Sequence, residues 1–214
     1  MSSDEENDDV LQDLEEIRDK MMNTPRNERM QVSAWEDDDD GVEAERNAKE
    51  PDEKAMLSAA EEGNLEKVKT LLSKNRLLLK CTDKDGYTPL HRACYADNVK
   101  VVEYLLEMGA RLDAKTQDEW QPLHSACCWN NVECALTLIS CGADVNARSK
   151  GDQTPLHLLC ASSHNSPALQ LFLLHPDTDF SILNSSGDTA AMIARRTTKF
   201  YPIFEITEPC LNEI

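Results

Sequence analysis

One phrase occurs three times along the chain, at a fixed spacing of 33 residues. It reads TPLHRAC from Thr88, QPLHSAC from Gln121 and TPLHLLC from Thr154. An apolar pattern with helical spacing follows each copy. A fixed period of this length is typical of repeat proteins, in which each repeat is one small unit that cannot bury its apolar face alone. The sequence therefore predicts a row of stacked units, each contacting only its neighbours.

The residue types of the phrase predict the local structure of a unit. Proline suits the first turn of a helix because it has no N–H group to leave unpaired, and the preceding Thr88 can cap that turn. Gly109 and Gly142 stand where a second helix would end in the left-handed conformation, and Asn75 takes the matching place upstream. Each unit is thus expected to contain a turn, a helix, a tight loop and an antiparallel helix.

The period of 33 with the letters T-P-L-H resembles the ankyrin-repeat family over residues 54–214. The resemblance implies an all-α ankyrin-repeat solenoid of helix-turn-helix units with β-turn loops. Repeats are expected at residues 83–115, 116–148 and 149–183, the last with extra residues between its helices near 162–167. Residues 54–82 are expected to form the N-terminal capping repeat, and residues 184–214 the C-terminal capping repeat and tail.

Residues 1–53 are predicted to form an acidic, largely disordered arm. They hold 20 of the 40 acidic residues and 6 of the 22 basic ones, with no dense apolar pattern. Leu14 and Ile17 belong to a helical pattern that predicts a short helix near residues 8–22. This helix could dock in a partner's groove, form only transiently, or pack on the chain's own repeats. Trp35, beside an acidic run, is either an anchor for a partner or one aromatic in a solvated segment.

Histidine and cysteine recur with the same spacing, which raises the question of a metal site. His91, His124 and His157 form one ladder, and Cys94, Cys127 and Cys160 form another. Equivalent atoms of stacked helices lie roughly 10 Å apart, whereas metal ligands must converge to about 2 Å from one ion. No metal or cofactor is therefore expected. The histidines should instead hold the backbone of the turns, and the cysteines should fill small apolar spaces as free thiols.

Several function classes find no support in the sequence. There is no phosphate-binding glycine loop and no nucleophile motif, so no catalytic residue is assigned and no enzyme is expected. The net charge of −18 disfavours direct contact with nucleic acid. The chain shows no membrane span and no secretion signal, so a nuclear or cytoplasmic protein is expected, with its thiols reduced.

The remaining feature is a surface of turn tips and first helices that together form the concave side of an ankyrin array. Aromatic residues and arginine are the usual anchors of protein interfaces. Tyr95 and Trp129 are expected to contact a partner, whereas Tyr87 and Trp120 could equally pack across adjacent turns. The partner-binding residues predicted for this face are Tyr87, Arg92, Tyr95, Asp118, Glu119, Trp120, Ser125, Trp129 and Gln153.

The predicted function is a monomeric, non-enzymatic adaptor that binds one or more protein partners, including basic ones, on this concave face. Two stretches, PLHSACCWNN at 122–131 and ARRTTKFYPIFEI at 194–206, are similar to one branch of the family. That similarity implies a role in regulating gene expression and an association with male germ cells. The alternative is a chaperone or escort whose acidic arm shields a basic client protein.

Overall fold

The computed structural model describes residues 51–161, 167–197 and Phe204. These residues form nine α-helices and one 3-10 helix, and they contain no β-strand. The predicted all-α class is thereby confirmed. The predicted arm, with Leu14, Ile17 and Trp35, lies outside the described residues, and so do most of the extra residues of the fourth unit. None of the helices described here is both long enough and apolar enough to cross a bilayer.

The helices come in consecutive pairs, which we number as units along the chain. The first unit holds α3 (Pro51–Glu61) and α4 (Leu65–Lys74), followed by the 3-10 helix η2 (Arg76–Lys80). The second holds α5 (Pro89–Tyr95) and α6 (Val99–Glu107), and the third holds α7 (Pro122–Cys128) and α8 (Val132–Ser140). The fourth holds α9 (Pro155–Ala161) and α10 (Pro167–Leu174), and the fifth holds α11 (Ala190–Thr197).

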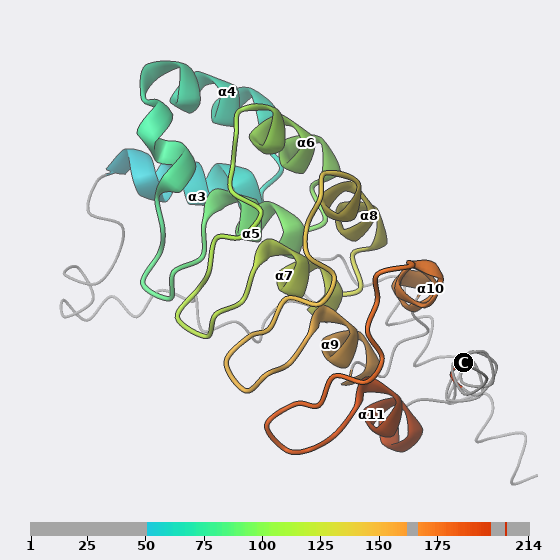
Figure 1. Ribbon diagram of the computed structural model, residues 1–214. Coiled ribbons are helices and arrows are strands. Elements are labelled where there is room, and N and C mark those ends of the chain that lie inside the picture. Colours follow the sequence, from blue (N-terminus) through green and yellow to red (C-terminus); the bar gives the residue numbers. More distant parts are fainter. Residues whose placement is uncertain (1–50, 162–166, 198–203, 205–214) are drawn as a thin grey trace, which may run out of the picture. The chain divides into compact units, whose positions relative to one another are not determined.

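The pairs stack into two rows of helices (Figure 1). Helices α3, α5, α7, α9 and α11 form the first row, each packing on the next, and α4, α6, α8 and α10 form the second row. The leucines of the repeated phrase, Leu90, Leu123 and Leu156, are at most 2% exposed and belong to one continuous core. Cys94, Cys127 and Cys160 are likewise buried, as predicted for small apolar positions between packed helices.

Three residues were predicted to end the second helix of a unit in the left-handed conformation, and two of them adopt it. Gly109 and Gly142 have positive φ angles of 90° and 91°, which is the conformation that favours glycine. Asn75 differs, because its φ of −145° is extended. The chain enters η2 at that point, and the Asn75 side chain accepts a hydrogen bond from the backbone N–H of Leu77. Asn75 therefore ends α4, where its backbone N–H donates to the carbonyl of Leu71, and its side chain caps the start of η2.

The loops between units form short hairpins whose tips project from one side of the first row (Figure 1). Neighbouring tips are joined by backbone hydrogen bonds. The N–H of Gln117 donates to the carbonyl of Asp85, and that of Lys150 donates to the carbonyl of Asp118, both at 2.8 Å. The Ser185 N–H donates to the carbonyl of Gly151 at 2.9 Å. The tips thus form a continuous edge beside the first-row helices.

Candidate binding face

His91 joins the second unit to the third through both of its ring nitrogens. The backbone N–H of Thr88 donates to Nδ1 at 3.2 Å, so this nitrogen must be the acceptor of a neutral ring. Nε2 then carries the proton and donates to the carbonyl oxygen of Trp120 at 3.0 Å. Helix α5 is therefore bonded to the tip that follows it.

The same arrangement recurs in the next two units. His124 accepts from the Gln121 N–H and bonds the Gln153 carbonyl at 3.1 Å. His157 bonds the Asp188 carbonyl at 3.2 Å. These contacts confirm that the histidine ladder holds turn backbone. Burial lowers the pKa of both His91 and His124 to about 4, because the charged ring would lose its hydration, so both rings are neutral near pH 7.

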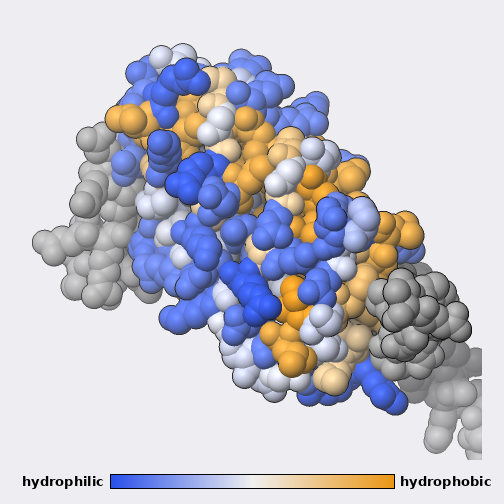
Figure 2. All heavy atoms as spheres, in the orientation of Figure 1, coloured by the Kyte–Doolittle hydropathy of each residue, from blue (hydrophilic) through white to orange (hydrophobic). Residues whose placement is uncertain are grey.

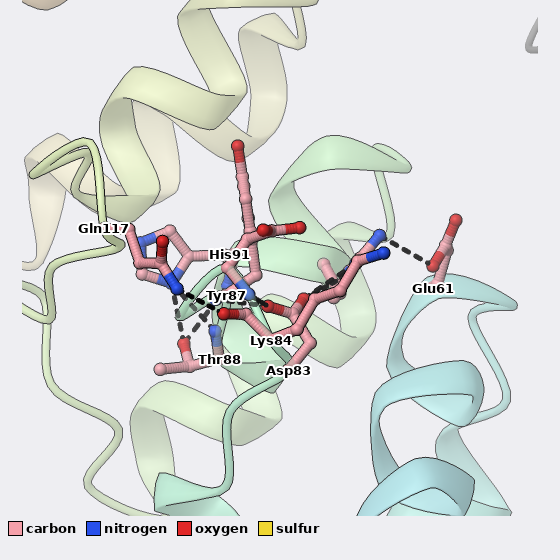
Figure 3. Close-up of polar contacts among 9 residues, drawn as sticks. Glu61, Asp83, Lys84, Tyr87, Thr88, His91 and Gln117 are labelled. Carbon is pink, nitrogen blue, oxygen red and sulfur yellow. Dashed lines mark hydrogen bonds and ion pairs between the residues drawn. The ribbon is translucent and has the colours of Figure 1, made fainter. Parts of the chain in front are cut away.

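Arg92 lies inside the molecule, in contrast to its expected place on the open face. Its side chain is 7% exposed, and its guanidinium pairs with Oδ2 of Asp83 through Nη2 at 2.7 Å and Nε at 3.2 Å. A longer contact of 3.4 Å reaches Glu61 on α3, which faces this network (Figure 3). The physical reason is that Asp83 is itself buried, and a buried carboxylate requires a charged partner.

Ser125 takes the place of Arg92 in the third unit and is also buried, at 1% exposure. Its Oγ finds no hydrogen-bond partner within the described part of the chain. In the fourth unit the same place is taken by Leu158, which is buried as well. This position of the repeat therefore faces inward in all three units, and neither Arg92 nor Ser125 offers its side chain to a partner.

Tyr95 and Trp129 form an aromatic pair that spans the second and third units. Tyr95 is the last residue of α5, and Trp129 directly follows α7. Their ring centroids are 5.0 Å apart, with an interplanar angle of 75°. Trp129 remains 51% exposed and Tyr95 is half-buried. The stack of the two units thus presents a preformed aromatic surface to the solvent.

Tyr87 and Trp120, at the hairpin tips, pack on the histidines of their own units. The Tyr87 ring lies 5.7 Å from His91 in an edge-to-face arrangement, and Trp120 stacks on His124 at 6.4 Å. The Arg92 guanidinium also lies 5.3 Å from the centre of the Tyr87 ring. These two rings are half-buried, so they support the tips and still expose one side.

The polar residues predicted at the tips are more exposed. Asp118 and Glu119 are exposed, and Gln153 is half-buried. Glu119 pairs with Lys115 at 2.7 Å, and this contact lowers the pKa of its carboxyl group. Within the described ranges, no group of three or more His, Cys, Asp or Glu side chains could hold a metal ion.

Comparisons with known proteins agree with this geometry. A family model for ankyrin repeats in three copies matches residues 55–149. The chain is 52% identical over 157 residues to ankyrin repeat domain-containing protein 49 of Homo sapiens, a match that covers 73% of this chain and 66% of the relative. The protein of that name from Bos taurus is 54% identical over 159 residues, which cover 74% of this chain and 67% of the relative. The chain belongs to the ankyrin-repeat family.

A more distant ankyrin relative of the same name comes from Drosophila melanogaster. It is 39% identical over 108 residues, which cover 50% of this chain and 48% of that protein. The chain thus matches about two thirds of the length of its mammalian relatives and about half of the fly protein. Ankyrin repeats are interaction modules, and the family match indicates no catalytic family.

The ankyrin units of this chain share a second contact that the sequence analysis missed. The Nδ2 group of Asn131 donates to the carbonyls of Cys94 and Tyr95 at the end of α5, at 2.7 and 2.8 Å. Asn98 does the same for Ala60 and Glu61 at the end of α3. The signal was present, because the two asparagines are 33 residues apart. Their amides satisfy helix-end carbonyls that have no partner within the helix.

Proposed function

We propose that this ankyrin array is a non-enzymatic adaptor that binds a protein partner around the Tyr95–Trp129 pair. The exposed aromatic pair carries the proposal. Tryptophan and tyrosine are enriched among the residues that dominate binding energy, because they bury a large area at a small cost in conformational entropy. Since the rings already pack against each other at 5.0 Å, little further ordering is needed on binding.

Other predicted residues would extend this contact along the tips. Asp118, Glu119 and the exposed sides of Tyr87 and Trp120 lie on the hairpins that border the first row. The Gln153 side chain completes the set. We leave out Arg92 and Ser125 because both are buried. The acidic tips favour a partner with basic residues, since opposite charges speed encounter and disfavour wrong partners.

A finer proposal concerns the process in which the adaptor acts. Regulation of gene expression, in the nucleus or cytoplasm, is supported by the resemblance of residues 122–131 and 194–206 to one branch of the family. The escort function is supported by the charge of residues 1–53, which would attract a basic client. Deleting residues 1–50 separates the two. An escort would lose salt-sensitive binding of its client, whereas an adaptor would keep its partner on the repeats.

The direct test is affinity purification with mass spectrometry, comparing the intact chain with Tyr95→Ala/Trp129→Ala. Loss of a defined partner from the double variant is expected. Leu77→Ala is the matched control, because Leu77 is also an exposed apolar residue, at 76%, but lies on η2. Thermal melting of each variant shows that the fold is retained. An unchanged set of partners in the double variant, and in Trp129→Ala alone, would contradict the proposal.

A further inference from the structure

A groove runs between α6 and α8, in the second row of helices. It has a volume of about 730 Å³. Figure 2 shows apolar surface, broken by polar patches, along the second-row helices. This row is separate from the end of α5 and the start of the turn after α7, where Tyr95 and Trp129 lie. The groove is therefore a second surface, distinct from the aromatic pair.

The groove arises from the residue sizes on the two facing helices. Glu103, Leu106 and Glu107 lie on one stripe of α6, at spacings of three and four residues. The stripe of α8 that lines the groove carries only short side chains, Thr137 and Ser140, followed by Cys141. Because these side chains are short, they leave open the space beside the longer side chains of α6.

Most of the polar groups along the groove are already used. The Thr137 hydroxyl donates to the carbonyl of Glu133 at 2.8 Å, and the Ser140 hydroxyl donates to that of Leu136. Glu103 and Glu107 are exposed, and neither takes part in an ion pair with another described residue. No Lys or Arg lines the groove. The two carboxylates are thus the groups available to recognise a ligand.

The negative charge of the groove limits which kind of molecule could bind there. The chain's own N-terminal segment, with 20 acidic and 6 basic residues, would be repelled by Glu103 and Glu107. Nucleic acid and anionic lipid would be repelled for the same reason. We propose that the groove docks a basic, amphipathic segment of a partner protein. Lys or Arg side chains about one helical turn apart would pair with the two carboxylates, and an adjacent aliphatic side chain would pack on Leu106 and Leu112.

Cys141 provides a local readout of this docking. It is exposed and lines the groove, whereas Cys128 is half-buried at the end of the first-row helix α7. The probe is a short synthetic amphipathic peptide of Leu and Lys, added to the full chain. Alkylation by N-ethylmaleimide is followed for each cysteine by peptide mass. We expect the Leu/Lys peptide to slow alkylation of Cys141 and to leave that of Cys128 unchanged, and a Leu/Glu peptide to protect neither.

The decisive variant is Glu103→Gln/Glu107→Gln, which keeps the shape of the groove. The variant loses the two ion pairs between the peptide and the groove. The peptide concentration needed to protect Cys141 should therefore rise about 10-fold. Glu62→Gln/Glu66→Gln removes the same charge from exposed residues at the α3–α4 turn, and should change little. The proposal would be overturned if the two double variants weakened protection of Cys141 equally. It would also be overturned if the peptide bound without protecting Cys141. Tyr95→Ala/Trp129→Ala should leave protection intact, so the two surfaces are tested separately.

Discussion

The second and third units share one backbone design but complete it with different chemistry. In the second unit Asp83 begins the hairpin tip, and Arg92 lies across from it on α5. In the third unit the corresponding residues are Thr116 and Ser125. Both pairs are buried. The difference shows that the repeat determines where these side chains point, whereas the buried charge of the second unit requires a charged partner that the third unit does not need.

The atoms explain why the two residues of each pair belong together. Oδ1 of Asp83 accepts the Tyr87 N–H at 2.9 Å, and Oγ1 of Thr116 accepts the Trp120 N–H at 3.1 Å. The tip therefore needs only one acceptor. Aspartate brings a second, charged oxygen, and Arg92 satisfies it at 2.7 Å. Threonine brings no extra charge, so a small serine suffices in the third unit.

Breaking the ion pair of the second unit should have the largest effect. Arg92→Ser leaves the Asp83 carboxylate buried without its main partner, and we expect a loss of about 3–5 kcal/mol in the free energy of unfolding. Urea denaturation measures this loss. The double variant Asp83→Thr/Arg92→Ser copies the third unit and should recover most of the stability. If the double variant is as unstable as the single one, Arg92 is not needed merely to pair with the buried Asp83 carboxylate.

Lowering the pH should reduce the free energy of unfolding, because both units contain a buried neutral histidine. The folded-state pKa values of His91 and His124 are about 4, below the usual value of 6.5, because burial penalises the charged ring. Between these values the unfolded chain binds more protons, so stability falls as the pH is lowered through this range. Each histidine should contribute a loss of about 2 kcal/mol between pH 7 and pH 5.

Urea denaturation at the two pH values tests this expectation. His124→Gln removes one titrating ring, so its stability should depend less steeply on pH than that of the parent chain. A free energy of unfolding that is flat between pH 7 and pH 5 would mean that the rings are not held neutral by burial.

Substitutions in the hairpin turns of the two units should change the stability by a smaller amount. Gly86 has a φ of 86°, and a Cβ there would lie 3.0 Å from Cα of Thr116 and 3.2 Å from the backbone nitrogen of Gln117. Gly86→Ala should therefore cost about 1–2 kcal/mol for the left-handed conformation, and more for the contact with fixed backbone. Glu119 occupies the equivalent turn position with a φ of 59°. Glu119→Gly relieves the strain of the left-handed conformation and should raise the melting temperature slightly. A lower melting temperature would show that the Glu119 side chain stabilises the fold by more than the backbone strain destabilises it.

The smallest effect is expected at Ser125. Ser125→Ala removes a buried hydroxyl whose Oγ has no partner among the described residues, so stability should be unchanged or rise by up to about 1 kcal/mol. Thermal melting measures the change. Ser125→Arg is the contrasting variant, because it introduces the charge of Arg92 without an Asp83 opposite, and it should destabilise the chain clearly. A tolerated arginine would mean that this position can open to the solvent.

Much of the fold could be predicted from local chemistry. The period of 33, the prolines at helix starts and the glycines at helix ends predicted the paired helices, because these depend on a few neighbouring residues. The binding face was less predictable. Tyr95 and Trp129 are indeed partly exposed, and their contact with a partner stays a prediction. Arg92 was assigned to the concave face from its place on the first helix and because arginine is a usual interface anchor, and nothing adjacent in the sequence indicated that Asp83 was buried opposite it.

The sequence by itself determined the repeated unit, the stacking of each unit on its neighbours, and the inward-facing leucines, cysteines and histidines. Those properties follow from helix periodicity and from backbone groups that must be capped wherever the unit occurs. The tertiary structure alone decided which polar side chains meet between units, namely Arg92 with Glu61, and the carboxylates of α6 beside the short side chains of α8. Such contacts join residues from different repeats, and they depend on how adjacent units fit in space, which no single repeat encodes.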